Sequence, residues 1–323
     1  MISVDLDPKQ PGRVLIGGAP EGQDARVLAE ICRRAGAATL VHVAIDDARA
    51  ARLQQALAFF APGTEVVQFP AWDCLPYDRV SPNPEVVGRR IDTLTRLAGS
   101  GRSAQRRIVI TTVNALLQRV PPRAAFADAT FTARPGDRID VDQLQQFLSR
   151  NGYTRAQTVR EPGEFAIRGG IIDLFPPGSG DDEAVRLDLF GDELEQVRSF
   201  DPISQRTTGK RDRVELRPMS EAFLDRDSIA RFRSGYRELF GAVTDEDPLY
   251  EAVSAGRKQA GMEHWLPLFH PEMETLLDYL PDAPVTLDHQ AEEAREARLA
   301  QIADFYEARR TMQDVEQIGR AHV

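Results

Sequence analysis

Residues 17–24 have the glycine spacing of a phosphate-binding loop, the element that holds nucleotide phosphates in P-loop proteins. They read GGAPEGQD, so Gly17 and Gly22 match the two glycines of G-x-x-x-x-G-K-[ST]. The position of the phosphate-binding lysine holds Gln23, and the position of the magnesium-binding serine or threonine holds Asp24. A helix N-terminus stabilises an anion by only about 0.3–1 kcal/mol, which we expect the loop's own carboxylates to outweigh. The spacing therefore indicates a degenerate loop without ATP hydrolysis. The alternative is an ordinary strand-to-helix turn in which Asp24 caps the helix.

Other residue types that carry out catalysis or bind metals are scattered along the chain. The two cysteines, Cys32 and Cys74, form no C-x-x-C pair, and the five histidines form no H-E-x-x-H motif. The acidic groups at 181–183 and 192–195 lie beside glycines without a histidine, which favours solvated surface over a metal site. The sequence therefore predicts no catalytic residues, no metal site and no cofactor for this chain.

Two predicted strands, one ending at Arg168 and one at Phe190, alternate between apolar and other side chains. Their apolar residues share one face, whereas Arg168, Arg186 and Phe190 fall on the opposite face. Arginine and aromatic residues are over-represented among the residues that dominate protein–protein binding. We therefore select these three as candidate binding residues. The alternative is that Phe190 packs on a neighbouring helix and Arg186 pairs with Asp188 or Glu195 across the surface.

The first part of the chain alternates strand-like and helix-like segments. Strands are expected at 14–16, 39–45, 65–69 and 107–112, and helices at 24–34, 46–60 and 85–97, with a proline-rich segment at 70–84. Strands that alternate with helices predict a parallel sheet covered on both faces. Residues 1–122 are therefore expected to form a P-loop-like parallel α/β domain.

After Pro121 and Pro122, the order and spacing of the expected helices and strands change. A helix at 141–150 and closely spaced strands, with a hairpin at Gly169 and Gly170, predict a compact α+β domain over 123–210. Residues 211–317 are expected to form a mostly helical third α/β segment. Its expected elements are helices at 228–240, 248–255, 272–280 and 290–317 and a strand at 284–288. Residues 318–323 can be encoded by the start of a common sequencing adapter, so we expect them to be a non-native tail.

The net charge of −10 argues against strong autonomous DNA binding, which usually requires a basic surplus. A weak DNA contact through Arg89 and Arg90 stays open, with a solvated helix face as the alternative. No apolar run approaches the roughly 18 residues of a membrane helix. The N-terminus also lacks a signal-peptide pattern, so we expect a cytoplasmic protein without membrane contact.

Several motifs resemble one known family. The middle region carries EPGEFAIR at 161–168, IIDLFP at 171–176, RLDLF at 186–190 and SQRT at 204–207. These resemble the UvrA-binding domain shared by the excision-repair protein UvrB and the transcription-repair coupling factors. The resemblance covers the chain from about Val14 to the end of the third domain. It includes FPAWDCLPY at 69–77 and ITTVNAL at 110–116 in the first domain, and WLPLF at 265–269 and YLP at 279–281 in the third.

The degenerate loop and the lack of a long tyrosine-rich insertion at 70–84 favour the coupling factors. The alternative is a fragment of a UvrB-like excinuclease subunit that binds nucleotide and damaged DNA. The resemblance implies an N-terminal module that recruits UvrA, with the UvrA-contacting positions at Arg168, Arg186 and Phe190. It also implies that RNA polymerase binding, DNA contact and an ATP- and magnesium-dependent DNA translocase belong to parts of the parent protein outside this sequence.

Overall fold

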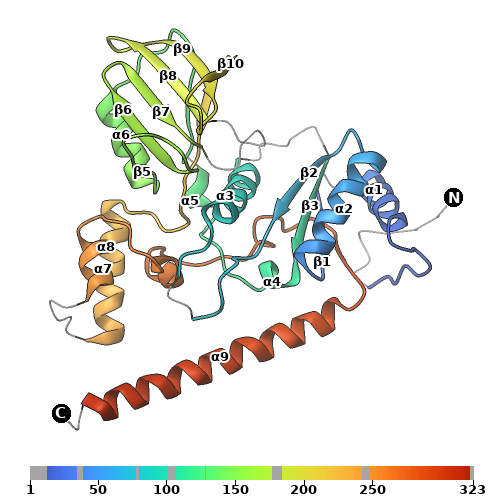
Figure 1. Ribbon diagram of the computed structural model, residues 1–323. Coiled ribbons are helices and arrows are strands. Elements are labelled where there is room, and N and C mark those ends of the chain that lie inside the picture. The colour runs from blue at the N-terminus through green and yellow to red at the C-terminus, as the bar shows by residue number, and fades with distance from the viewer. Residues whose placement is uncertain are drawn as a thin grey trace.

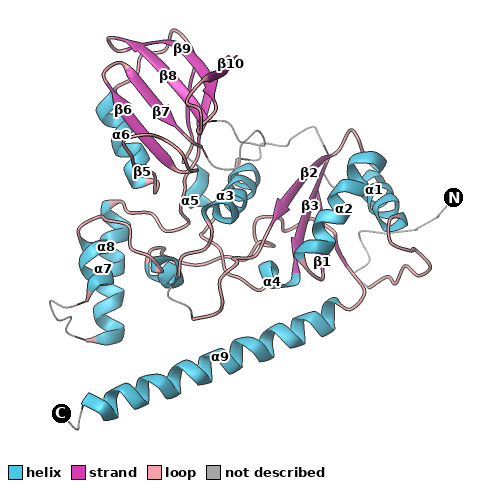
Figure 2. Ribbon diagram, viewed as in Figure 1, coloured by secondary structure: helices cyan, strands magenta, loops and turns pink. Residues whose placement is uncertain are grey.

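The computed structural model describes residues 13–34, 39–77, 80–99, 106–127, 129–176, 184–241 and 247–320, with 312–320 described by their backbone alone. The acidic residues 181–183, and residues 321–323 of the predicted tail, lie outside the described residues. The chain forms a parallel sheet with helices on both faces, a separate six-stranded sheet, a small helical group and a long C-terminal helix (Figures 1 and 2). This mixed α/β architecture confirms the predicted fold class.

The first body is a four-stranded parallel sheet in the order β12-β1-β3-β2. Its strands are β1 (Thr39–Ala44), β2 (Glu65–Phe69), β3 (Arg107–Thr112) and β12 (Val285–Leu287). Helices α1 (Gln23–Arg34) and α2 (Asp47–Phe60) pack with Leu40 and Ile108 on one face. Helix α3 (Pro84–Ala98) packs with Val41 and Val109 on the other, beside the short helix α4 (Val113–Leu116).

The strand predicted at 14–16 does not form, and this expectation was wrong. Residues 13–19 run as irregular chain with no strand pairing, and the Leu15 side chain is 88% exposed. A parallel strand needs a hydrogen-bonded neighbour and cover on both faces, which this short run does not have. Arg13 instead forms an ion pair with Glu292 near the start of the last helix. The edge of the sheet beside β1 is formed by β12, from the far end of the chain.

The second body is the six-stranded sheet, in the order β10-β9-β8-β7-β6-β5. Its strands are β5 (Thr154–Arg155), β6 (Glu164–Arg168), β7 (Ile171–Leu174), β8 (Ala184–Phe190), β9 (Glu193–Phe200) and β10 (Thr207–Arg211). Helix α6 (Val141–Arg150) covers one face, where Leu144 and Leu148 pack on Phe165 and Leu187. The strands β4 (Phe131–Ala133) and β11 (Val214–Leu216) pair where the chain enters and leaves this body. The short helix α5 (Ala124–Ala127) precedes that entry.

The third segment contains α7 (Arg226–Phe240), α8 (Pro248–Ser254) and the 3-10 helix η1 (Met262–Leu268), packed around Phe232 and Phe269. The helix predicted at 272–280 is absent, and the segment forms turns. The Asp278 carboxylate accepts hydrogen bonds from the backbone and hydroxyl of Thr275, and Glu274 bridges to Val120. These local bonds hold the backbone in conformations that compete with a helix.

The helix α9 (Ala291–Arg320) extends past the rest of the molecule (Figure 1). Its Tyr306 ring lies 5.5 Å from that of Tyr77, and Arg309 donates to the Tyr77 carbonyl, so the proline-rich segment supports it. Among the described residues, no helix combines the length and apolarity needed to cross a membrane. The boundaries placed at 122 and 210 stay predictions, although β12 shows that the third segment returns to the first sheet.

Arg90 is not a DNA contact, contrary to the possibility raised by the sequence. Its side chain is completely buried, and its Nε donates to Glu221 at 2.5 Å. Its Nη1 donates to the Pro70 carbonyl and to Gln118, and its guanidinium lies 4.3 Å from the centre of the Phe69 ring. A guanidinium without exposed surface cannot reach a DNA phosphate. Its role is to join α3 to the loop that follows the second body.

Candidate binding surface

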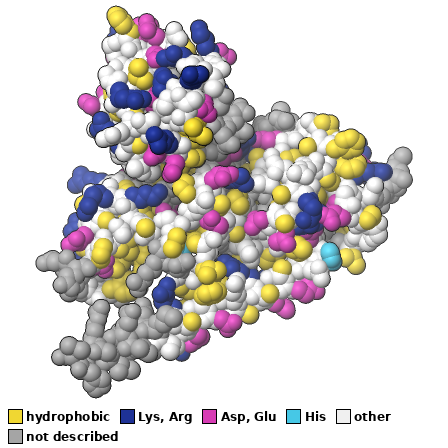
Figure 3. Space-filling model, viewed as in Figure 1, with side chains coloured by type: hydrophobic (Ala, Val, Ile, Leu, Met, Phe, Trp, Pro, Cys, Tyr) yellow, Lys and Arg dark blue, Asp and Glu magenta, His cyan; other side chains and the backbone are white. Residues whose placement is uncertain are grey.

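The six-stranded sheet has an outer face, defined as the face turned away from α6. Strand pairing places Ala166, Asp173, Arg186 and Arg198 directly opposite one another across β6, β7, β8 and β9. Because side chains two positions apart share a face, Arg168 and Asp188 belong to the same outer face. A small apolar cluster that includes Ala166 and Phe200 covers one end of this face. Basic, acidic and hydrophobic side chains are interspersed over this body (Figure 3).

Asp173 lies at the centre of the outer face and is completely buried. Its carboxylate accepts hydrogen bonds from Arg186 Nε at 2.6 Å and Nη2 at 3.0 Å, and from Arg168 Nη2 at 2.5 Å. The structure therefore brings together two of the three predicted binding residues, through an aspartate that the sequence analysis did not select. A signal for it was present, because Asp173 is a charged residue inside the apolar run IIDLF.

The two arginines present different amounts of surface. The Arg186 side chain is 15% exposed, whereas that of Arg168 is 50% exposed. The Arg186 guanidinium lies 4.7 Å from the centre of the Phe200 ring, and its hydrogen bonds to Asp173 raise its pKa further. Arg186 pairs with Asp173. The alternative, in which Arg186 pairs with Asp188 or Glu195, was therefore wrong. Asp188 pairs with Arg198 through two contacts of 2.6 Å.

Phe190 projects from the end of β8 and is 77% exposed, so it does not pack on a helix within the described residues. It precedes the turn at Gly191, whose φ of 65° favours glycine. The turn at Gly169 and Gly170 lies at the same end of the sheet, because Leu189 donates to the Gly170 carbonyl at 2.7 Å. A Cβ on Gly170 would lie 2.6 Å from the Leu189 carbonyl oxygen, so only glycine permits this approach. Both turns therefore bring Arg168 and Phe190 to one end of the outer face.

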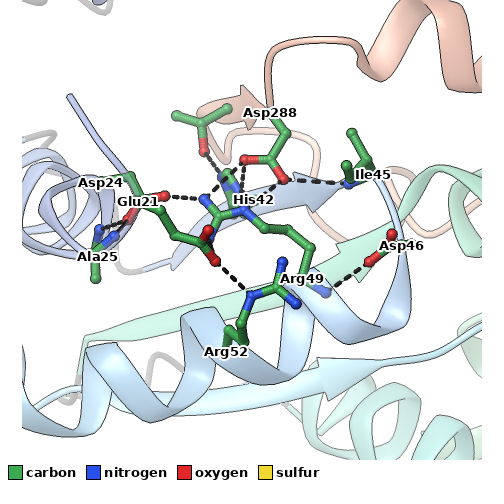
Figure 4. Close-up of polar contacts among 11 residues, drawn as sticks. Glu21, Asp24, Ala25, His42, Ile45, Asp46, Arg49, Arg52 and Asp288 are labelled. Atoms are coloured by element: carbon green, nitrogen blue, oxygen red, sulfur yellow. Dashed lines mark hydrogen bonds and ion pairs between the residues drawn. The ribbon is translucent and has the colours of Figure 1, made fainter. Parts of the chain in front are cut away.

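The acidic residues of the loop at 17–24 form ion pairs with arginines of α2 (Figure 4). Helix α1 begins at Gln23, so Asp24 lies in its first turn and is not the residue before it. The Asp24 carboxylate accepts hydrogen bonds from the backbone of Gly22 at 2.9 Å and of Ala25 at 2.7 Å, and it pairs with Arg49 of α2. These are the kinds of donor that an anion bound at a helix N-terminus would use.

Further charged groups surround that pair. Arg49 also contacts Asp288 at 3.3 Å, and Arg52 contacts Glu21 at 2.5 Å. Asp288 follows β12, and His42 lies 3.4 Å from its carboxylate. Burial alone would raise the pKa of Asp288, but the contacts with His42 and Arg49 lower it to about 2. The cluster therefore links α1, α2 and the end of β12. Among the described residues, no group of three or more His, Cys, Asp and Glu is arranged to hold a metal ion.

Known proteins resemble the chain in two ways. The family model described as the UvrB interaction domain matches residues 131–221, which include the outer face. The transcription-repair-coupling factor of Haemophilus influenzae is 34% identical over 306 residues, which are 94% of this chain and 26% of that protein. That of Escherichia coli K12 is 36% identical over 268 residues, 83% of this chain and 23% of that protein. That of Mycobacterium bovis is 31% identical over 246 residues, 72% of this chain and 19% of that protein. The chain thus spans about a quarter of the length of the first relatives it matches.

Proposed function

The chain belongs to the transcription-repair-coupling factors as their N-terminal UvrB-homology module, and from this premise we propose that it recruits UvrA to DNA where RNA polymerase has stalled. The observation that carries the proposal is the exposed Phe190 beside the Arg168–Asp173–Arg186 group, within the segment that matches the UvrB interaction domain. The module itself would bind and not catalyse. Its place of action would be the cytoplasm, where bacterial RNA polymerase works.

The exposed side chains fit a protein-binding role. Complete burial of a phenylalanine side chain contributes about 1.5–3 kcal/mol. Phe190 is 77% exposed and gains little of this from the described residues. Arg168 keeps half of its side chain exposed and uses one nitrogen for Asp173, so other N–H groups are available to an acidic partner. An aromatic anchor next to an arginine is the composition of binding hot spots.

The proposal extends to the missing parts of the parent protein. Contacts with RNA polymerase and DNA, and an ATP-dependent translocase that uses magnesium, would belong to the roughly three quarters of the relatives' length that this chain does not span. We propose no nucleotide cofactor for this chain, because the Asp24 carboxylate and the Arg49 guanidinium already form an ion pair with each other at the loop. This favours a coupling-factor module over a UvrB-like subunit.

Replacement of Phe190 by alanine tests the proposed function. We expect Phe190→Ala to weaken binding to purified UvrA at least about tenfold, the scale of a hot-spot residue, with an unchanged melting temperature. Ile203→Ala is the matched control, because Ile203 is also strongly exposed but follows the other end of β9. Binding constants from calorimetry would decide. Equal affinity of Phe190→Ala and the wild-type chain would contradict the proposal.

A further inference from the structure

The buried Asp173 carboxylate has two arginine partners, one on each neighbouring strand. Arg186 lies directly opposite it on β8, and Arg168 lies diagonally across on β6. Transfer of a carboxylate from water into the protein interior is strongly unfavourable unless the carboxylate is paired with a cation and hydrogen-bonded. Asp173 therefore needs these partners in order to be buried, and its position in turn determines where both guanidinium groups lie.

Arg186 and Arg168 use Asp173 differently. Arg186 directs both Nε and Nη2 at the carboxylate and lies over the Phe200 ring, which leaves little of it accessible. Arg168 directs only Nη2 at the carboxylate and keeps half of its side chain exposed. A partner protein can therefore reach Arg168 far more easily than Arg186.

We infer that Asp173 is a positioning residue of this surface. With Arg186 it forms a largely buried ion pair, and this pair fixes the position of the Arg168 guanidinium. Of the two arginines, only Arg168 then binds an acidic side chain of the partner. The inference rests on the proposed recruitment of UvrA. An arginine held in place before binding loses less side-chain entropy when the complex forms. Arg186 then contributes to affinity through Asp173 and not through its own contact with the partner.

The binding test removes the buried pair as a unit. Asp173→Asn alone would leave the Arg186 guanidinium buried without a carboxylate and destabilise the sheet, so Asp173→Asn is combined with Arg186→Met. We expect Arg168→Ala and the Asp173→Asn/Arg186→Met double variant each to weaken UvrA binding about tenfold. The triple variant should bind no more weakly than either, because the pair acts through Arg168.

Several results of the binding test would overturn the inference. A triple variant weakened by the product of the two effects, about a hundredfold, would show that Arg186 contacts UvrA itself. Wild-type affinity of the double variant would show that the pair positions nothing. Asp188→Asn is the matched control, since Asp188 makes a similar two-contact pair with Arg198 on the same face. It should bind UvrA as the wild type does, and a comparable loss would indicate general disruption of the face and overturn the inference.

A readout without UvrA separates this inference from the proposed function. In the wild-type chain, the side-chain NMR signals of Arg168 should show restricted rotation of the guanidinium, and in the double variant they should show free rotation. Failure of the wild-type chain to bind UvrA would refute the proposed function. Free rotation of Arg168 in the wild-type chain would refute the positioning role, whatever UvrA does.

Discussion

At the scale of single residues, the outer face is organised by the Asp173 carboxylate, which is completely buried and pairs with Arg168 and Arg186. Alternation along two strands placed Arg168, Arg186 and Phe190 on one face, and the strand pairing confirms this placement for Arg168 and Arg186. Phe190 lies beyond a register shift in the pairing of β8 with β9 and is 77% exposed. The partner Asp173 was missed because strand register cannot be read from one sequence. A charged residue inside an apolar run is consistent with several pairings until the neighbouring strand is known. Whether the three residues bind UvrA stays a prediction.

The loop at 17–24 gives a residue-scale prediction about nucleotides. We expect isothermal calorimetry of the chain with Mg-ATP to show no binding, because Asp24 accepts the backbone donors of the loop and Arg49 neutralises it. The matched variant Gln23→Lys/Asp24→Ser restores the residues of the phosphate-loop pattern. It should also fail to bind tightly, because the strand that normally precedes such a loop is absent among the described residues. Micromolar binding by the wild-type chain would contradict this prediction.

At the scale of elements, the sequence predicted most helices and strands, and two of the predicted elements do not form. The helix at 141–150 and the strands at 65–69 and 107–112 form with the predicted bounds, because hydrophobic periodicity and burial act together there. The strand at 14–16 fails because it has no neighbouring strand to pair with, and the helix at 272–280 fails because local side-chain hydrogen bonds hold that segment in turns. The position of β12 in the first sheet was likewise hidden, since it depends on a pairing across most of the chain.

The attachment of β12 gives an element-scale prediction. The pKa of Asp288 in the folded chain, about 2, lies below the roughly 3.9 of an exposed aspartate, so its ionisation stabilises the fold above pH 4. We expect Asp288→Asn to lower the free energy of unfolding by about 2 kcal/mol at pH 7. The difference between wild type and variant should shrink as pH falls from about 4 to 2, where Asp288 becomes protonated. Urea denaturation across this range would measure it, and a difference that is independent of pH would contradict the assignment.

At the scale of the whole molecule, one buried group connects the three parts of the chain. The Glu221 carboxylate accepts from Arg90 of α3 and from Trp72 Nε1 in the proline-rich segment, and its carbonyl contacts His270 Nε2 at 2.7 Å. Glu221 itself follows β11, where the second body ends. A coupling of this kind needs residues far apart in sequence, so composition and periodicity could not reveal it.

This connection predicts cooperative unfolding of the entire chain. Trp72, from the proline-rich segment, and Trp265, from η1, both pack against the core of the third segment. Their fluorescence therefore reports on that segment and its junction with the first part, whereas amide exchange of β7 and β8 reports on the second body. Both probes should give one urea midpoint in the wild type. Glu221→Gln should cost about 3–5 kcal/mol, because it leaves the buried Arg90 charge uncompensated, and should separate the two midpoints. An Arg90→Met/Glu221→Gln variant should recover much of that stability, yet keep the midpoints apart, since it restores charge balance without the connection. Different midpoints in the wild type would show instead that the second body already unfolds independently and that Glu221 does not couple it to the rest.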